Sequence, residues 1–354
     1  MNTILAFIIL IGLIVSIHEF GHFLTAKLFG VYVHEFSIGM GPQLFSKQGK
    51  ETKYSLRLLP IGGYVSMAGE NVNTEVEADK AIVEDRKFYN QKYWKKIIIL
   101  LAGVTMNFML SWLIFSCIVL NLGGYVSPIN TTLSGVTKNS PAERAGFKVG
   151  DKITAIIVDE NRINVDNFTD IHIATYDTDG KELTWVINRN GEVLELNVAS
   201  EYNADEDRYM VGIQASTDKI YEVKWYNAPY YGFRYMIDQG VGLIRSLRLL
   251  FLPGGMKQIS GPIGIADVAG QAANSGIMSY INLIALISLN VGIMNLLPLP
   301  VLDGGQIVIE TIEKIFKRKM SEKFKFALMA TCWILLLGLM FIATYNDIVR
   351  IFRA

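Results

Sequence analysis

Four long apolar stretches divide the chain into membrane and non-membrane segments. Each is close to the ~20 residues that a helix needs to cross a bilayer. They run from about Ile4 to Leu28, Ile97 to Leu122, Tyr280 to Leu302 and Phe326 to Tyr345. Proline lacks an amide proton, so Pro298 and Pro300 should break the third stretch near its end. The pattern predicts a membrane α-helical protein with four transmembrane helices.

The first apolar stretch lacks the other features of a signal peptide. It carries no Lys or Arg before Lys27, and no small-residue cleavage site is evident. We therefore expect it to remain in the protein as a helix.

Two segments between the spans have the composition of strands and turns. Between the second and third spans, Ile153 to Val158 and Leu183 to Arg189 are rich in strand formers, and Asn190-Gly191 is a turn signal. We expect a soluble, β-rich domain there. Between the first and second spans, Phe36 to Tyr64 mixes strand formers with glycines that permit tight turns. This segment predicts a re-entrant β-hairpin region, which is tolerated at membrane depth only against protein or a watery cavity.

An amphipathic pattern follows the β-rich segment, from Pro229 to Leu252. Tyr231, Tyr235 and Leu247 alternate at helical spacing with Arg234 and other arginines. Two interpretations remain open: a surface helix on the protein, or an amphipathic helix at the membrane interface.

Composition agrees with a membrane protein that carries a soluble part. Half of the residues, 51%, are apolar, and only 19% are charged, below the usual quarter. Basic and acidic residues number 33 each, so no basic field indicates a nucleic-acid partner. Cys117 and Cys332 both lie in apolar stretches, which argues against a disulfide framework.

Basic residues in the short loops predict the orientation in the membrane. Lysines precede the second span at 92, 95 and 96, and six basic residues lie between the third and fourth spans. Cytoplasmic loops carry such an excess. We therefore expect both loops inside, and both termini and residues 123–279 outside.

The first span ends in the motif His18-Glu19-Phe20-Gly21-His22. Residues four apart lie on one face of a helix, so His18 and His22 can bind one metal ion together. Glu19 beside them can act as general base towards a water. A chance match on a surface helix is the competing explanation. Ionisable residues in an apolar span are costly and usually functional, which favours the metal site.

A catalytic zinc site needs a third protein ligand and an open position. The best candidate is Asp303, which closes an apolar span otherwise free of charge. A simple helix end with a capping Asp is the alternative. The proline break frees backbone groups that could pair with an extended substrate, and Asn295 could clamp its backbone. His34 and His172 are better explained as ordinary surface or core histidines, and Glu35 and Glu70 remain weak alternatives for the third ligand.

These residues suggest metal-assisted peptide hydrolysis inside the membrane. Glu19 would take a proton from the attacking water and give it to the leaving amine. A helical substrate must unwind before attack because its backbone hydrogen bonds shelter its peptide bonds. We hypothesise that an edge within Phe36 to Tyr64 holds the unwound segment by strand addition.

Several motifs together resemble the site-2 protease family of intramembrane metalloproteases, in its bacterial branch. They occur in the family's order over nearly the whole chain. They are His18-Glu-Phe-Gly-His22, Glu35-Phe-Ser-Ile-Gly-Met-Gly-Pro42, Leu59-Pro-Ile-Gly-Gly-Tyr-Val65, Ala102-Gly-Val-Thr-Met-Asn107-Phe108, Ser260-Gly-Pro-Ile-Gly-Ile265 and Asn295 to Gly305. Val104 departs from the family's usual proline. Residues such as Asn139-Ser-Pro-Ala-Glu-Arg-Ala-Gly-Phe147 and Val149-Gly-Asp-Lys-Ile153 resemble a single PDZ domain.

The resemblance implies a division of the chain and of its residues' roles. Residues 1–122 and 280–354 would form the peptidase, 123–205 an extracytoplasmic α+β PDZ domain, and 206–279 the connection to the membrane. Zinc would be held by His18, His22 and Asp303, with Glu19 as base. Substrate contacts are expected at Asn295, Pro298, Pro300, Asn107, Gly62 and Gly63.

The resemblance also implies a location and substrates. The protein would lie in the bacterial cell membrane, within the lipid. Its substrates would be single-span membrane proteins, such as anti-sigma factors and signal-peptide remnants, selected by size at the PDZ domain.

Two other functions compete with the protease. One is a PDZ-bearing membrane scaffold or chaperone with an inert metal site, against which the intact Glu19 argues. The other is a metal transporter, which would need ionisable residues in several spans. This chain has one compact cluster and few others.

Overall fold

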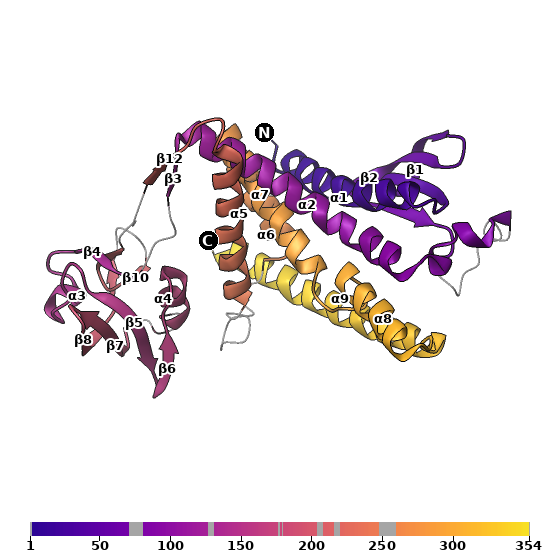
Figure 1. The fold of residues 1–354 in the computed structure, drawn as a ribbon. Coiled ribbons are helices and arrows are strands. Elements are labelled where there is room, and N and C mark those ends of the chain that lie inside the picture. Colours follow the sequence, from indigo (N-terminus) through magenta and orange to yellow (C-terminus); the bar gives the residue numbers. More distant parts are fainter. Residues whose placement is uncertain are drawn as a thin grey trace. The chain divides into compact units, whose positions relative to one another are not determined.

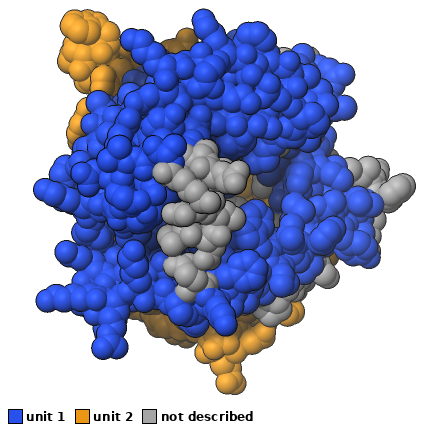
Figure 2. Space-filling model, turned by 90° about the vertical axis from the view of Figure 1, so that its right-hand side faces the viewer, with its two compact units in different colours: residues 1–118, 260–354 blue, residues 119–259 orange. Residues whose placement is uncertain are grey.

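The structure is a computed structural model of the chain. Contacts divide it into two compact units, shown in different colours in Figure 2: unit 1 comprises residues 1–118 and 260–354, and unit 2 residues 119–259. The residues described are 2–70, 81–126, 131–175, 178, 180–203, 208–215, 220–247 and 260–353.

Four helices of the described chain are long and apolar enough to cross a membrane. They are α1 (Thr3–Leu28), α2 (Tyr93–Leu122), α7 (Ile277–Asn295) and α9 (Glu322–Arg353) (Figure 1). This confirms the four predicted spans, and α1 continues through the histidine motif as one helix. The third span is shorter than predicted because its helix ends at Asn295, ahead of both prolines.

Shorter elements complete unit 1. They are α6 (Pro262–Ser275), α8 (Asp303–Phe316), the 3-10 turns η2 (Glu84–Arg86) and η3 (Phe88–Asn90), and the strands β1 (Val33–Gln48) and β2 (Lys53–Met67).

Strands β1 and β2 form a folded hairpin beside α1. The first half of β1 lies between the two halves of β2, because Ile38 faces both Gly63 and Leu56. Arg57, at the bend of β2, donates to Glu35 on β1 at 2.8 Å and to the Tyr64 hydroxyl at 2.6 Å. The guanidinium therefore joins both strands at the fold. The strands predicted in this segment are present, while the depth of the hairpin in the membrane stays a prediction.

Unit 2 contains a four-stranded antiparallel sheet in the order β6-β5-β7-β8. Trp185, Ile153 and Ile187 are almost fully buried in its core, with Phe147 edge-on to Trp185. The elements are β3 (Gly124–Val126), β4 (Leu133–Val136), α3 (Pro141–Arg144), β5 (Lys152–Val158), β6 (Asn161–Asn164), α4 (Phe168–Ala174), β7 (Glu182–Arg189), β8 (Glu192–Ala199), β9 (Glu201–Asn203), β10 (Arg208–Met210), β11 (Ile213–Ala215), β12 (Ile220–Glu222) and α5 (Ala228–Ser246).

Helix α5 is the predicted amphipathic segment, and residues 248–252 of that prediction lie outside the described chain. Gly232, Met236 and Gly240 are buried on one side, whereas Phe233 and Ile237 are exposed on another. Whether the exposed face meets lipid stays a prediction.

An ion pair between a buried carboxylate and a half-buried arginine joins two strands of unit 2. Asp151 has no exposed surface and accepts two hydrogen bonds from Arg189, at 2.7 and 2.8 Å. Burial alone would raise the pKa of Asp151, but bonds from Arg189 and the Lys148 amide hold that pKa below its ordinary range. The pair thus joins the start of β5 to the end of β7 when the carboxylate is ionised.

We expect Asp151→Asn to destabilise unit 2 by about 3 kcal/mol, because Arg189 keeps its charge without its partner. Hydrogen exchange of the β5 amides in the full chain should accelerate on the order of a hundred-fold at neutral pH. Because the pKa is lowered on folding, the pair's contribution is complete above the unfolded pKa of about 3.9 and declines as pH falls below it. The difference should therefore shrink in acid. Glu195→Gln, at an exposed position of β8, is the control; equal exchange in both variants would contradict the prediction.

Candidate active site

Three side chains from two helices converge on one point in unit 1. His18 Nε2 and His22 Nε2 are 3.2 Å apart, and Asp303 Oδ2 lies 3.2 Å from the first and 3.5 Å from the second. Zinc bonds of 2.0–2.1 Å in a tetrahedron would separate the ligand atoms by about 3.3 Å. The three separations match that edge length. Asp303 Oδ2 is buried and has no hydrogen-bond donor in the described chain, as a metal ligand requires.

Helix α2 closes the site on one side and leaves no room for a side chain at Gly103. A Cβ built there would overlap His22 Nε2 and lie 2.8 Å from His18 Nε2. Gly21 on α1 lies equally close to the Ala102 carbonyl. Two glycines therefore allow α1 and α2 to approach closely at the depth of the histidines.

Helix α2 also orients the His22 ring. His22 Nδ1 lies 2.8 Å from the Ile99 carbonyl oxygen, which can only accept. The proton of a neutral His22 must then sit on Nδ1, which leaves the Nε2 lone pair for a metal ion.

Asp303 reaches the histidines because the chain folds tightly before α8. The Leu296 carbonyl lies against Gly304, and the Leu299 carbonyl against Gly305, so that a Cβ at either glycine would overlap it. Gln306 donates to the Pro300 carbonyl at 2.7 Å. The two glycines after Asp303 thus accommodate the loop that follows α7.

Glu19 lies in the same cavity as the three candidate ligands. This cavity, of about 370 Å³, is lined by His18, Glu19, His22, Asn295 and Asp303 among others. The Val65 amide of β2 bonds to the Glu19 carboxylate. The carboxylate therefore lies between the candidate metal ligands and the β2 strand.

The predicted substrate residues occupy three kinds of position. Asn295 is half-buried and lines the cavity. Gly62 and Gly63 are buried in β2, and Gly63 adjoins Glu19, whose Cγ would be 3.5 Å from a Cβ built there. These three remain predicted substrate contacts.

The prolines and Asn107 are placed differently. Pro298 is exposed in the loop after α7, and the Pro300 carbonyl is engaged by Gln306. The Leu299 and Leu302 amides also bond to loop carbonyls, so several backbone groups freed by the helix break are already satisfied. Asn107 is fully buried behind His18.

The weak alternatives for the third ligand, Glu35 and Glu70, are not in the cluster, and neither are the two histidines set aside in the sequence. Glu35 pairs with Arg57, and His34 packs edge-on against Tyr32. Glu70 lines the cavity but is not among the converging ligand atoms of the described residues. His172 is in α4 of unit 2, and its side chain lies outside the described part.

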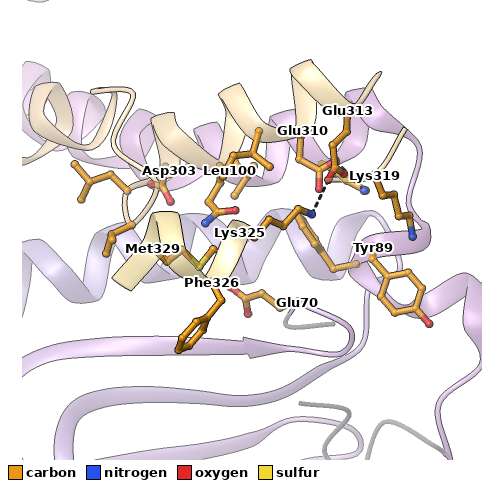
Figure 3. Close-up of a pocket in the computed structure, with 16 residues that line it drawn as sticks. Glu70, Tyr89, Leu100, Asp303, Glu310, Glu313, Lys319, Lys325, Phe326 and Met329 are labelled. Carbon is orange, nitrogen blue, oxygen red and sulfur yellow. Dashed lines mark hydrogen bonds and ion pairs between the residues drawn. The ribbon is translucent and has the colours of Figure 1, made fainter. Parts of the chain in front are cut away.

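A second, larger cavity of about 530 Å³ continues from Asp303 along α8. In Figure 3, Asp303 lies at one end and Tyr89 with Lys319 at the other. Two ion pairs line it: Lys96–Glu310 at 2.9 Å and Lys325–Glu313 at 2.7 Å. This cavity could not be recognised from the sequence, although the acidic residues on α8 and the lysines near the start of α2 are visible there as charges.

Comparison with known proteins identifies the family. Residues 6–339 match the model of Peptidase family M50. The chain belongs to this family, that of the site-2 proteases. A Clostridium acetobutylicum protein named "Putative zinc metalloprotease CA_C1796" is 34% identical over 354 residues, covering 98% of this chain and 97% of its own.

Other relatives are equally extensive. "Putative zinc metalloprotease FN1322" of Fusobacterium nucleatum is 34% identical over 99% of this chain and 100% of its own. "Probable protease eep" of Enterococcus faecalis is 30% identical, and the match covers 99% of this chain and 100% of that protein. The M50 chain is thus a metalloendopeptidase with a zinc cofactor, and its four apolar helices make it a membrane protein.

We expect Gly103→Ala to abolish zinc binding, because the added methyl group occupies the space of both imidazoles. Metal content of the purified chain should fall from about one zinc to a small fraction. The control is Gly338→Ala in α9, where an added Cβ meets no atom of the described residues within 4 Å. Full zinc content in Gly103→Ala would show that the two helices are farther apart than described.

Proposed function

We propose that this M50 protein is an intramembrane protease that cleaves peptide bonds within the transmembrane segments of single-span membrane proteins. The supporting observation is the tetrahedral spacing of His18, His22 and Asp303, with Glu19 beside them on an apolar helix. Metal ligands on a membrane-spanning helix would act on peptide bonds that lie within the membrane. The alternative of an inert metal site in a scaffold leaves Glu19, ionisable and lining the cavity, without a role.

The proposed mechanism assigns a step to each residue around the cavity. His18, His22 and Asp303 would hold the zinc ion, which would supply polarisation of the scissile carbonyl and a lowered pKa of the attacking water. Glu19 removes the proton of the attacking water and delivers it to the leaving amine. The Val65 amide keeps the Glu19 carboxylate turned to this position. Asn295, on the same cavity wall, donates to the substrate backbone.

The second half of β2 is proposed to hold the unwound substrate. Among the described strands, residues 63–67 pair with β1 on one side only, and Gly63 adjoins Glu19. An extended peptide added to the edge that faces away from β1 would pass in front of the catalytic carboxylate, beside the Val65 amide that bonds to it. Gly63 has no side chain that would keep this backbone away.

Water is proposed to reach the site through the larger cavity along α8. This cavity and the cavity around Glu19 have five lining residues in common: Glu70, Leu100, Val301, Leu302 and Asp303. Four ionised side chains along its wall favour water over lipid. Hydrolysis consumes water, so a site surrounded by apolar helices needs such a route.

Unit 2 is proposed to contain a PDZ domain on the extracytoplasmic side, with both termini on that side. The buried sheet core and the motif from Asn139 to Ile153 support a PDZ-like domain.

We propose the bacterial cell membrane as the location. Anti-sigma factors and signal-peptide remnants, admitted by size, are the proposed substrates.

We expect Glu19→Gln to stop cleavage of a single-span reporter, with at least a thousand-fold loss, while zinc is retained. The amide keeps the shape of the carboxylate but cannot accept the proton. Quantitative blots of the reporter and metal analysis of the purified variant would be compared with Asp303→Ala, which should lose both cleavage and zinc. Wild-type cleavage in Glu19→Gln would refute the protease assignment of this site.

Proline on the β2 edge should impair cleavage of helical substrates. We expect Ser66→Pro to slow cleavage about ten-fold or more by disturbing the strand that receives the substrate. Ser46→Pro is the matched control because Ser46 lies in the part of β1 that pairs with the first half of β2. Equal rates in the two variants would argue against strand addition.

A further inference from the structure

Asn107 is a buried amide directly behind one of the candidate zinc ligands. It lies on α2 with no exposed surface, and its side-chain Nδ2 is 3.3 Å from His18 Nδ1. Its Oδ1 atom is buried and has no hydrogen-bond partner in the described chain. The resemblance to the family suggested a substrate contact for Asn107, which this placement does not explain.

The chemistry of the imidazole decides what His18 needs from its neighbour. His18 directs Nε2 at His22 and Asp303, so Nε2 must be free of a proton to bind zinc. The proton of the neutral ring then lies on Nδ1, which becomes a donor and requires an acceptor. His22 has the Ile99 carbonyl for this purpose. The group at His18 Nδ1 is the Asn107 amide.

Rotating the Asn107 side-chain amide by a half-turn about its last bond places its oxygen, a hydrogen-bond acceptor, next to His18 Nδ1. The oxygen and nitrogen of an Asn side chain occupy equivalent positions, and their assignment follows from the hydrogen bonds around them. With Nδ2 facing Nδ1, two N–H groups would oppose each other in the zinc-binding tautomer. With Oδ1 facing Nδ1, the ring donates a hydrogen bond to Asn107.

Neighbouring helices fix the backbone that carries this amide. Ser288 on α7, itself fully buried, donates to the Asn107 carbonyl at 3.0 Å. Next along α2, the Phe108 ring lies against Gly292, where a Cβ would be 2.6 Å from the ring. The position of Asn107 relative to His18 is therefore set by the contact between α2 and α7.

We infer that Asn107 is a positioning residue that accepts the Nδ1 proton of His18 and thereby holds the ring in its zinc-binding tautomer. The inference rests on the proposed function, since it takes His18 as a zinc ligand. It predicts an effect on zinc affinity, which a substrate contact would not produce.

The test measures zinc affinity in the purified full-length chain by competition with a chromophoric chelator. We expect Asn107→Leu to weaken zinc binding about 10–100-fold, the usual effect of losing the partner of a ligating histidine. Asn107→Asp should keep zinc binding within about three-fold of wild type, because a carboxylate oxygen accepts the same proton. Ser111→Ala, one turn further along α2 and equally buried, removes only a bond to the Ala285 carbonyl and should match wild type.

Each contrary outcome has a separate meaning. Wild-type zinc affinity in Asn107→Leu would overturn the inference, and a raised KM in that variant would assign Asn107 to substrate binding. Equal zinc loss in Asn107→Asp and Asn107→Leu would also overturn it, because the acceptor is present in the first. If Asn107→Leu is unstable without metal, the Asn107→Asp comparison decides. Unchanged zinc in His18→Ala would instead refute the ligand assignment on which the proposed function rests.

Discussion

The structure of the membrane unit depends on the close approach of α1 and α2 at the depth of the histidines. Helices normally pack with axes 8–10 Å apart because side chains separate them. Here Gly21 and Gly103 remove those side chains where they would meet the facing helix. The Ile99 carbonyl can then reach His22, and the Asn107 amide can reach His18. The same packing that joins the helices therefore also orients both candidate metal ligands.

A second constraint is the need to satisfy backbone groups where the third span breaks. In an apolar setting, each unpaired amide or carbonyl is costly. The loop between α7 and α8 meets this need with its own short turns and with Gln306, whose amide binds the Pro300 carbonyl. Gly304 and Gly305 let the loop lie on the first turn of α8. As a result Asp303 starts a helix and faces the histidine pair from a distant part of the sequence.

The sequence was most informative where the residues that form a site lie on a single helix. His18 and His22 share a helix face by spacing alone, so their convergence could be predicted without tertiary structure. Asp303 could be proposed because a carboxylate at the end of an apolar span is unusual, but its distance to the histidines depends on the loop after α7. The boundary of that span was predicted seven residues too late, at Leu302 instead of Asn295, because hydropathy continues through the prolines.

Contacts between helices could not be predicted from the sequence. Nothing in the pattern shows that Gly103 faces both imidazoles, or that Asn107 lies directly behind His18. The double register of β1 against β2 was equally hidden, because strand composition does not specify that Ile38 faces two segments. The charged cavity along α8 requires α2, α8 and α9 to be placed together, although each of its charges was visible in the sequence.

The spacing of the three ligand atoms also bears on folding. Two imidazole nitrogens and a carboxylate oxygen, all offering lone pairs within 3.5 Å of one another, repel unless a cation or a shared proton lies between them. Zinc bound by these three candidate ligands would remove this repulsion, and its binding energy would then add to the stability of the arrangement that brings α1 and α8 together. Without zinc, a proton shared between Asp303 and an imidazole would draw the same groups together but would occupy a lone pair that the metal needs. Competition between protons and zinc for this one cluster would therefore weaken metal binding as pH falls.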